Sequence, residues 1–280
     1  MESEINIKKL NGIAKRIRQN AIKAIILAGS GHCAGTLGIA DVLVALYFGG
    51  IMRHDPSMPN MRSRDRFFLS AGHLCPALYA SLAEAGYFPK RELWSLRKLG
   101  SPLQGHTYYK SMPGVENTSG PLGHGISVAV GTAYALRHFE KSNQTVFCLS
   151  SDGEHDEGQT WEAIMFAGSK RLPNLKMIID RNNIQSDGAT EDIMPIEPLA
   201  EKYESFNWRV LEVDGHNIKD IIDTLNEAKS ITEKPVCVIA HTIPGKGVKF
   251  MEGSHVWHAK PLEGQEASEA LKQLGLKSGL

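Results

Sequence analysis

The sequence is poor in cysteine and has no long apolar run. Its 280 residues include 4 cysteines, which are widely spaced and form no CxxC pair: Cys33, Cys75, Cys148 and Cys237. In a chain of this length, such cysteines indicate reduced and mostly buried thiols instead of a disulfide framework. No apolar run approaches the roughly 20 residues that span a bilayer, and the N-terminus lacks the apolar core of a signal peptide. We therefore expect a cytoplasmic protein without a membrane-spanning segment.

The chain also lacks an excess of charge of either sign. Lys and Arg number 31, Asp and Glu number 31, and the formal net charge is zero. This balance argues against a protein that binds nucleic acid. The apolar fraction of 42% is ordinary for a globular protein, and 280 residues lie near the upper limit for a single core. We expect one large domain or two small ones.

The first half of the chain is mainly helical in pattern. Amphipathic spacing predicts helices, glycines interrupt them, and one short strand is expected before a long irregular stretch. The helices are expected at 5–28, 39–48 and 74–85, the interruption at 29–38, the strand within 65–73 and the irregular stretch at 100–125. An irregular stretch of that length in a compact domain is usually functional or mobile.

The second half alternates apolar strands with helices. Strands are predicted at 145–150, 175–180, 208–214 and 235–242, and helices at 159–171, 196–206 and 217–229. Short apolar strands separated by helices are typical of a parallel sheet that is covered on both faces. The sequence therefore predicts an α/β fold with a doubly wound parallel sheet.

Polar residues follow two of these strands where each one ends. Asp152 and Gly153 follow the first, and Asn182 follows the second, thirty residues later. Ligands of such sheets bind beyond the carboxyl ends of the strands, so these tips should meet in space. Carboxylate and amide oxygens suit Mg²⁺ or Ca²⁺, and the Gly153 N–H can approach a phosphate oxygen. An Asx turn at each strand end would explain the same residues without a ligand.

Asp152-Gly153 and Asn182 resemble the GDG…N motif of thiamine diphosphate enzymes, with Ser151 in place of the first glycine. The resemblance implies that Asp152, Asn182 and the backbone carbonyl of Ile184 hold Mg²⁺, for which Ca²⁺ or Mn²⁺ can substitute. It also implies that Asn182 and Gly153 face the diphosphate of the cofactor, thiamine diphosphate.

Further segments are similar to transketolase in their order and spacing. They are "SGHCAGTLGIADVLVALY" at 30–47, "DRFFLSAGH" at 65–73, "GSPLQGH" at 100–106, "PGVENTSGPLGHGISVAVG" at 113–131 and "HVWHAKPL" at 255–262. The resemblance covers residues 5–262 and implies four active-site histidines. His73 and His258 are expected to face the cofactor, whereas His32 and His106 are expected to reach the hydroxyls of the sugar.

The same resemblance gives expectations for the remaining motif residues. Gly120 and Leu122 should lie near the aminopyrimidine, Ile243 should pack on the cofactor, and Glu157 should lie at a subunit interface. His124 stands where the family commonly has glutamine. Glu154 and Asp156 are interpreted as helix-start charges. His155 is interpreted as a helix-start residue and as a candidate for lining the site.

Transketolase chains are much longer than this one, and the resemblance implies how the function is divided. Residues 1–265 match the diphosphate-binding domain, and 266–280 are expected to form a peripheral helix with a frayed end. A separate C-terminal subunit should supply the pyrimidine-binding and C-terminal domains, in a heterotetramer. The expected activity is transfer of a two-carbon ketol unit from a ketose phosphate to an aldose phosphate, as in the pentose phosphate pathway.

Three alternatives remain open at this point. The first is a ketol transferase of the same architecture that acts on an unusual sugar phosphate. The second is a non-catalytic thiamine-family homologue that serves as a partner protein. The third is a magnesium-dependent hydrolase, which requires further carboxylates at other strand tips, such as Asp214.

Overall fold

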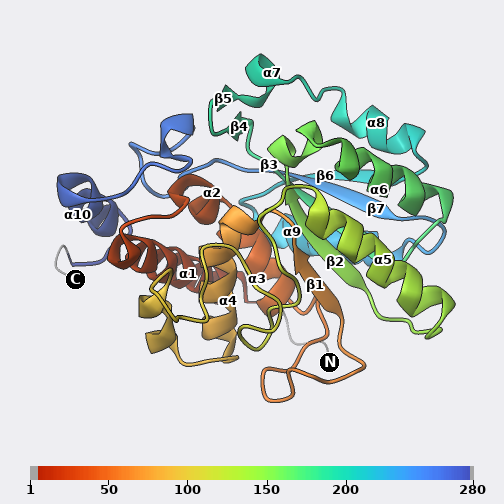
Figure 1. Cartoon of the computed structure of the whole chain (residues 1–280), viewed down its shortest axis with the longest axis horizontal. Helices are drawn as coiled ribbons and strands as arrows, with labels where there is room; N and C mark the ends of the chain where they lie inside the picture. The colour runs from red at the N-terminus through yellow and green to blue at the C-terminus, as the bar shows by residue number, and fades with distance from the viewer. Residues whose placement is uncertain (1–5, 278–280) are drawn as a thin grey trace.

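A five-stranded parallel sheet forms the centre of the computed structural model, which describes residues 6–277 (Figure 1). The strands lie in the order β1-β2-β3-β7-β6, and every neighbouring pair is parallel. Their bounds are β1 (Arg66–Leu69), β2 (Val146–Ser151), β3 (Leu175–Arg181), β6 (Arg209–Asp214) and β7 (Val236–His241). All five lie where the sequence predicts a strand, which confirms the expected parallel sheet.

Helices cover both faces of this sheet. On one side lie α1 (Ile7–Ala28), α3 (Ala40–Phe48), α4 (Cys75–Ala85) and α9 (Ile218–Ser230); on the other lie α5 (His124–His138), α6 (Gly158–Ser169) and α8 (Leu199–Ser205). Successive residues of a strand point to opposite faces. Phe147 and Leu149 of β2 therefore join the first core, whereas Val146 and Cys148 join the second. The doubly wound arrangement is confirmed.

The ends of α1 follow from two residues of the sequence. The Asn6 side chain accepts a hydrogen bond from the Lys9 N–H at 3.0 Å, which caps the start of the helix. Gly29 adopts a left-handed conformation with φ of 68° and ends it. The helix therefore begins at Ile7; residue 5, its predicted start, lies outside the described residues.

Three α-helices of the described chain lie outside the ranges predicted as helical, and the shortest of them is α7 (Thr190–Ile193). α2 (Cys33–Gly38) lies in the stretch expected to interrupt the helices, and all of its residues are buried. Glycine weakens a helix by about 1 kcal/mol relative to alanine, and burial here outweighs that preference. α5 follows the irregular stretch and buries Ile126, Ala129, Val130 and Ala133, which have helical spacing. Residues 100–123 contain no α-helix or strand, as expected.

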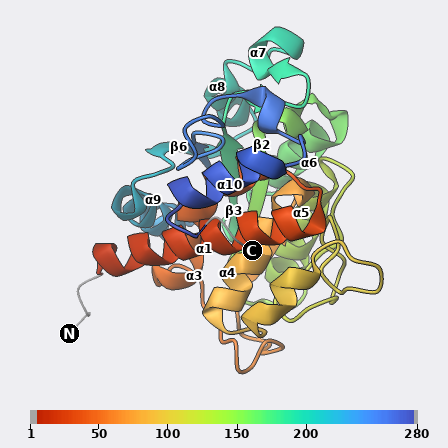
Figure 2. The ribbon, with the colours of Figure 1, turned by 90° about the vertical axis from the view of Figure 1, so that its left-hand side faces the viewer.

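The C-terminal helix α10 (Gly264–Gln273) packs beside α1 (Figure 2). Its Ala270 and Leu271 belong to the same core as α1, and the Gln19 side chain donates to the Leu274 carbonyl at 2.8 Å. The expected boundary at residue 265 falls within this helix. Residues 278–280, which were expected to fray, lie outside the described part of the chain.

Two further expectations concern the environment of the chain. Over residues 6–277, no helix combines the length and apolar character required to cross a membrane. All four cysteines are buried and unpaired, as the sequence predicts. Burial raises the pKa of the Cys33 and Cys75 thiols to about 12, so both stay protonated near neutral pH.

Candidate active site

Four histidines from four separate segments meet in the structure. The ring of His32 has its centroid 5.4 Å from that of His73 and 5.3 Å from that of His258. The ring of His106 lies 6.0 Å from His32, and the rings of His73 and His258 lie 5.2 Å apart. These are the four histidines that the family resemblance implies. The fold brings them together although they are far apart in the sequence.

Each histidine is held by a different local element. His32 immediately precedes α2, and His73 lies in the 3₁₀ helix η1 (Gly72–Leu74), which follows β1. His106 lies in the irregular stretch, and His258 directly follows the 3₁₀ helix η4 (His255–Trp257). The cluster is therefore built from loops and helix ends, which is where binding residues gather on a rigid scaffold.

Glycines allow these segments to approach one another closely. A side chain on Gly35 would place its Cβ 2.6 Å from Leu74 in η1, and one on Gly72 would collide with Ser119. Gly120 has φ of 129°, and a Cβ there would lie 3.8 Å from the ring of His106. The backbone at Gly120 therefore lies beside the cluster, and its expected position near the aminopyrimidine stays a prediction.

The four imidazoles favour the neutral state. Burial lowers the pKa of His32 to about 4, and His258, His106 and Arg97 add to this effect. Burial likewise lowers the pKa values of His73, His106 and His258. Near neutral pH each ring therefore offers one N–H donor and one nitrogen lone pair.

Asp152 begins the 3₁₀ helix η3 (Asp152–Asp156) after β2 and is only 1% exposed. Its Oδ1 accepts the Gly153 N–H at 2.8 Å. Its Oδ2 accepts the Asn183 N–H at 2.7 Å and an Arg181 N–H at 3.2 Å. The contact with Asn183 shows that the tips of β2 and β3 meet. A carboxylate has about four lone-pair positions, so one on Oδ1 has no partner among the described residues.

Burial also makes the charge of Asp152 costly. It raises the pKa of this carboxyl to about 6, although the Asn183 N–H and the Arg181 guanidinium act in the opposite direction. A cation at the open position of Oδ1 would stabilise the ionised form. The Asp152 side chain therefore fits a metal ligand.

Asn182 follows β3 and is oriented by its neighbours. The fully buried Asp180 accepts a hydrogen bond from the Asn182 amide nitrogen at 2.9 Å and another from the Thr242 hydroxyl. The Asn182 Oδ1 accepts the Ile184 N–H at 3.0 Å. This is an Asx turn, and it leaves a second lone pair on Oδ1. The turn and a ligand role are therefore compatible.

Arg181 ties this strand tip to the segment that follows it. Its guanidinium donates to the Thr190 hydroxyl at 2.7 Å, to Glu191 at 2.9 Å and to Glu197 at 2.8 Å, in addition to Asp152. One guanidinium thus faces three carboxylates. The surplus of negative charge fits a divalent cation beside Asp152.

Glu154 lies in the first turn of η3, as expected for a helix-start charge, but its side chain does not face solvent. It is fully buried, and its carboxylate joins three segments of the chain. Oε1 accepts the Ser70 hydroxyl at 2.6 Å and the Gly123 N–H at 2.8 Å, and Oε2 accepts the Ser151 N–H at 3.0 Å. The last contact completes a capping box with Ser151, the residue that replaces the glycine of the family motif.

His155 does not line the histidine cluster, contrary to its interpretation as a candidate for lining the site. Its Nδ1 faces the carbonyls of Ser151 and Asp152 at 3.0 and 3.1 Å, so this nitrogen carries the proton. Its Nε2 accepts the Tyr203 hydroxyl at 2.8 Å. The ring therefore packs against α8, apart from the other four histidines. Asp156 ends η3, two residues before α6 begins, and its Oδ2 accepts the Gln185 amide at 3.3 Å.

The other motif residues keep their side chains accessible. Leu122 is 37% exposed and Ile243 39%, and Glu157 is exposed at the start of α6 without a side-chain capping hydrogen bond. His124 begins α5 with Nδ1 3.3 Å from the Gln159 amide nitrogen. The cofactor and interface roles of these residues stay predictions.

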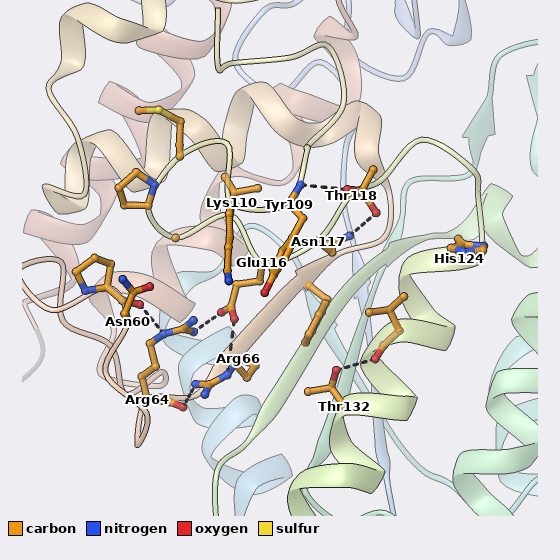
Figure 3. A pocket seen from close by; sticks show the side chains of 17 residues that line it. Asn60, Arg64, Arg66, Tyr109, Lys110, Glu116, Asn117, Thr118, His124 and Thr132 are labelled. Carbon is orange, nitrogen blue, oxygen red and sulfur yellow. Dashed lines mark hydrogen bonds and ion pairs between the residues drawn. The ribbon is translucent and has the colours of Figure 1, made fainter.

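A separate pocket of about 780 Å³ lies beside α5 and contains none of the four clustered histidines (Figure 3). Its charged lining consists of Arg64, Arg66, Lys110 and Glu116. Arg64 pairs with Glu116 at 2.5 Å, and Arg66 donates to the Arg64 carbonyl at 2.5 Å. Because these charges are mostly engaged with one another or with the backbone, we assign the chemistry to the histidine cluster.

The hydrolase alternative finds no support in the strand tips. Among the described residues, no three His, Cys, Asp or Glu side chains come together in a group that could hold a metal ion. Asp214 accepts the N–H of His216 at 2.9 Å, which closes a turn after β6. A cation near Asp152 would therefore depend on amide, carbonyl or cofactor oxygens.

Comparison with known proteins gives the family. The model named "transketolase, thiamine diphosphate binding domain" matches residues 10–279. The chain is 42% identical over 261 residues to the 6-deoxy-6-sulfo-D-fructose transketolase subunit SqwG of Clostridium sp. (strain MSTE9), covering 93% of this chain and 94% of that relative. It is 37% identical to an apulose-4-phosphate transketolase subunit of Phocaeicola vulgatus, covering 96% of this chain and 95% of the relative.

A solved structure agrees with these matches. The transketolase of Campylobacter jejuni superimposes with a TM-score of 0.90 at 33% identity, over 99% of this chain but 44% of that one. The chain therefore belongs to the transketolase family and forms its thiamine diphosphate-binding domain. In length it matches the relatives that are themselves called transketolase subunits, and it spans less than half of the single-chain enzyme.

Two acidic residues at the site were not recognised from the sequence. Asp180 orients Asn182, and Glu154 joins η3 to the segments around Ser70 and Gly123. The only signal for Asp180 was a carboxylate at the end of the apolar strand "LKMIID". A buried carboxylate needs donors, and those donors come from residues distant in sequence.

Proposed function

We propose that this chain is the cofactor-binding subunit of a two-chain, Mg²⁺-dependent transketolase. With a second subunit it would transfer a two-carbon ketol unit from a ketose phosphate to an aldose phosphate. The observation that carries this proposal is the cluster of four neutral histidines that the fold assembles. The Gly120 backbone beside His106 and the strand tips at Asp152 and Asn182 support it further.

In this proposal Asp152 and Asn182 hold Mg²⁺ through their Oδ1 atoms, and the Ile184 carbonyl is a third ligand. The open lone pairs of the two side chains support this assignment, and so does the negative surplus around Arg181. Oxygen ligands of this kind suit Mg²⁺. Gly153 stays the proposed backbone contact of the diphosphate.

Thiamine diphosphate, when bound, supplies the carbanion chemistry of ketol transfer. The chain would bind the sugar and move protons between hydroxyl oxygens and imidazole nitrogens. Because burial lowers their pKa values, the four histidines have a free nitrogen lone pair near neutral pH and can accept a proton. His32 and His106 would face the sugar, and His73 and His258 the cofactor.

The proposed partner is a separate subunit with the pyrimidine-binding and C-terminal domains, in a heterotetramer with two copies of each chain. Exposed apolar side chains on α5 and α6 support such a partner. Val128 is 40%, Met165 53% and Phe166 40% exposed. Glu157 starts α6 and would lie in the same interface. Permanent interfaces of this kind usually exceed about 2,000 Å².

The identity of the sugars is a second part of the proposal. Relatives of this chain are named for 6-deoxy-6-sulfo-D-fructose and for apulose 4-phosphate. An unusual sugar of this kind is therefore the leading alternative to a common ketose phosphate. A non-catalytic role is disfavoured because a partner protein has no need of the four clustered histidines. The unpaired, buried cysteines fit a reducing compartment such as the cytoplasm.

Calorimetry with thiamine diphosphate and Mg²⁺ tests the proposal. Thiamine diphosphate is titrated into the chain alone and into its mixture with the proposed partner subunit, which we expect the adjacent reading frame to encode. EDTA is the control for the metal. We expect Mg²⁺-dependent binding in the mixture. Absence of binding in the mixture would contradict the assigned function. A panel of ketose phosphates and sulfo-sugars then identifies the donor.

A further inference from the structure

A chain of hydrogen bonds links α1 to the segment that carries Ile243. His216 follows β6, and its Nδ1 lies 2.9 Å from Asp41 Oδ2 in α3. The backbone N–H of Ile243 donates to His216 Nε2 at 2.7 Å. Asp41 is held from the other side by Arg18, whose two terminal nitrogens donate to it at 3.0 and 2.5 Å. Arg18 also donates to the Leu37 carbonyl at 2.9 Å.

These contacts fix the tautomer of His216. A backbone N–H can only donate, so the Nε2 that receives it carries no proton. The proton therefore lies on Nδ1 and is donated to Asp41. Burial acts to raise the pKa of Asp41, but the His216 hydrogen bond and the Arg18 guanidinium outweigh it and lower that pKa. The hydrogen-bonded series thus consists of an ionised carboxylate between a guanidinium and a neutral imidazole. All three side chains are nearly buried, with exposed fractions between 7 and 11%.

The held backbone begins the segment that leads to the histidine cluster. Two residues after Ile243, the Gly245 N–H donates to the Ala34 carbonyl of α2 at 2.8 Å. Gly38 of α2 lies close to this backbone, because a Cβ there would be 3.1 Å from the Ile243 carbonyl oxygen, which is a tight contact. The backbone at 243–245 is therefore pressed against α2, the helix that His32 precedes, and the same segment continues to His258.

We propose that His216 is a positioning residue of the cofactor site. Its Nε2 lone pair fixes the backbone of Ile243, and thereby directs the exposed Ile243 side chain and the start of the segment that ends at His258. Asp41 and Arg18 keep His216 in the tautomer that has this lone pair. The proposal rests on the proposed function, because that function gives Ile243 and His258 their cofactor-facing roles.

The geometry separates a positioning role from mere packing. Phenylalanine at position 216 fills the space of the ring but cannot accept the Ile243 N–H. Glutamine can place its amide oxygen near the position of Nε2 and accept it. Packing alone would favour phenylalanine, which keeps the volume of the ring, whereas positioning requires glutamine to restore what phenylalanine loses.

Two measurements test this assignment. Long-range ¹H–¹⁵N NMR of the wild-type chain should show His216 with a protonated Nδ1 and an unprotonated Nε2; the opposite tautomer would overturn the proposal without any variant. Hydrogen exchange of the Ile243 amide should be faster by roughly tenfold in His216→Phe than in wild type, and near wild type in His216→Gln, as expected for one hydrogen bond.

The assembled enzyme gives the functional comparison. In the presence of Mg²⁺, the assembly that contains His216→Phe should have a roughly tenfold lower affinity for thiamine diphosphate than the wild-type assembly. The affinity of the His216→Gln assembly should be close to that of wild type. If wild type binds and His216→Phe binds equally well, the positioning role is wrong while the proposed function stands. If wild type itself fails to bind, the proposed function and the cofactor role of His216 both fail, even where the tautomer is as expected.

Discussion

Replacement of Asp152 by asparagine tests whether a costly buried charge is kept at this strand tip. Burial raises the pKa of Asp152 to about 6, against roughly 4 for an ordinary aspartate. Each unit corresponds to about 1.4 kcal/mol, so ionised Asp152 destabilises the cofactor-free fold by about 3 kcal/mol. The asparagine variant lacks this charge at every pH.

The sign of the effect follows from the raised pKa. Below about pH 4 the carboxyl is protonated in both the folded and the unfolded chain, so it has no cost. Between pH 4 and 6 the unfolded chain ionises first, and the stability of wild type falls relative to Asp152→Asn. Above pH 6 the loss is complete. Burial and the Asp152 charge raise the pKa of Asp180 to about 7, so loss of that charge in Asp152→Asn changes the difference in the same direction.

Urea unfolding from pH 4.5 to 7.5 measures this difference. The free energy of unfolding of wild type minus that of Asp152→Asn should fall by about 2 kcal/mol across this range, because part of the total loss has already occurred at pH 4.5. Asp192→Asn removes an exposed carboxylate and should give a flat difference. A flat difference for Asp152→Asn as well would refute the argument. Saturating Mg²⁺ and thiamine diphosphate should stabilise assembled wild type but not assembled Asp152→Asn.

Three further changes have distinct expected results. Glu154→Ala leaves three donors without their acceptor and should lower the free energy of unfolding by more than about 3 kcal/mol in urea, whereas Glu157→Gln should change it by less than about 0.5 kcal/mol. In Asp180→Asn, the new amide nitrogen would face the Asn182 amide nitrogen, so two donors would meet and Asn182 would lose the acceptor that orients it. Calorimetry should then show Mg²⁺-dependent cofactor binding weakened by roughly tenfold, and unchanged binding would contradict the orienting role. Met165→Asp should weaken the association of the two chains in sedimentation experiments by tenfold or more without lowering the melting temperature, and normal association would exclude α6 from the interface.

The parallel sheet was predictable because its strands are short apolar runs with helices between them. The predicted meeting of Asp152 with the residues after β3 followed from the same topology, and the structure confirms it. The four histidines were identified only through their motifs, since single histidines in loops have no local signal. Their proximity depends on contacts at Gly35 and Gly72 that join segments distant in sequence.

What the sequence did not predict is chiefly the direction of polar side chains. Glu154 and His155 lie in a run of acidic residues that resembles a solvated helix start. Glu154 instead points into the core toward Ser70, and His155 points toward Tyr203. The partners lie 84 and 48 positions away, so no local pattern reveals them. His216 likewise finds Asp41 across 175 positions.

Reconstitution of ketol transfer tests the central claim most directly. The chain, its proposed partner and an equimolar mixture are each assayed with ketose and aldose phosphates, Mg²⁺ and thiamine diphosphate. We predict turnover in the mixture and none for this chain alone, with His73→Ala abolishing it while the assembly stays intact. Substantial turnover by this chain alone, or a mixture that forms the assembly and binds the cofactor but transfers no ketol unit from any donor, would contradict the account.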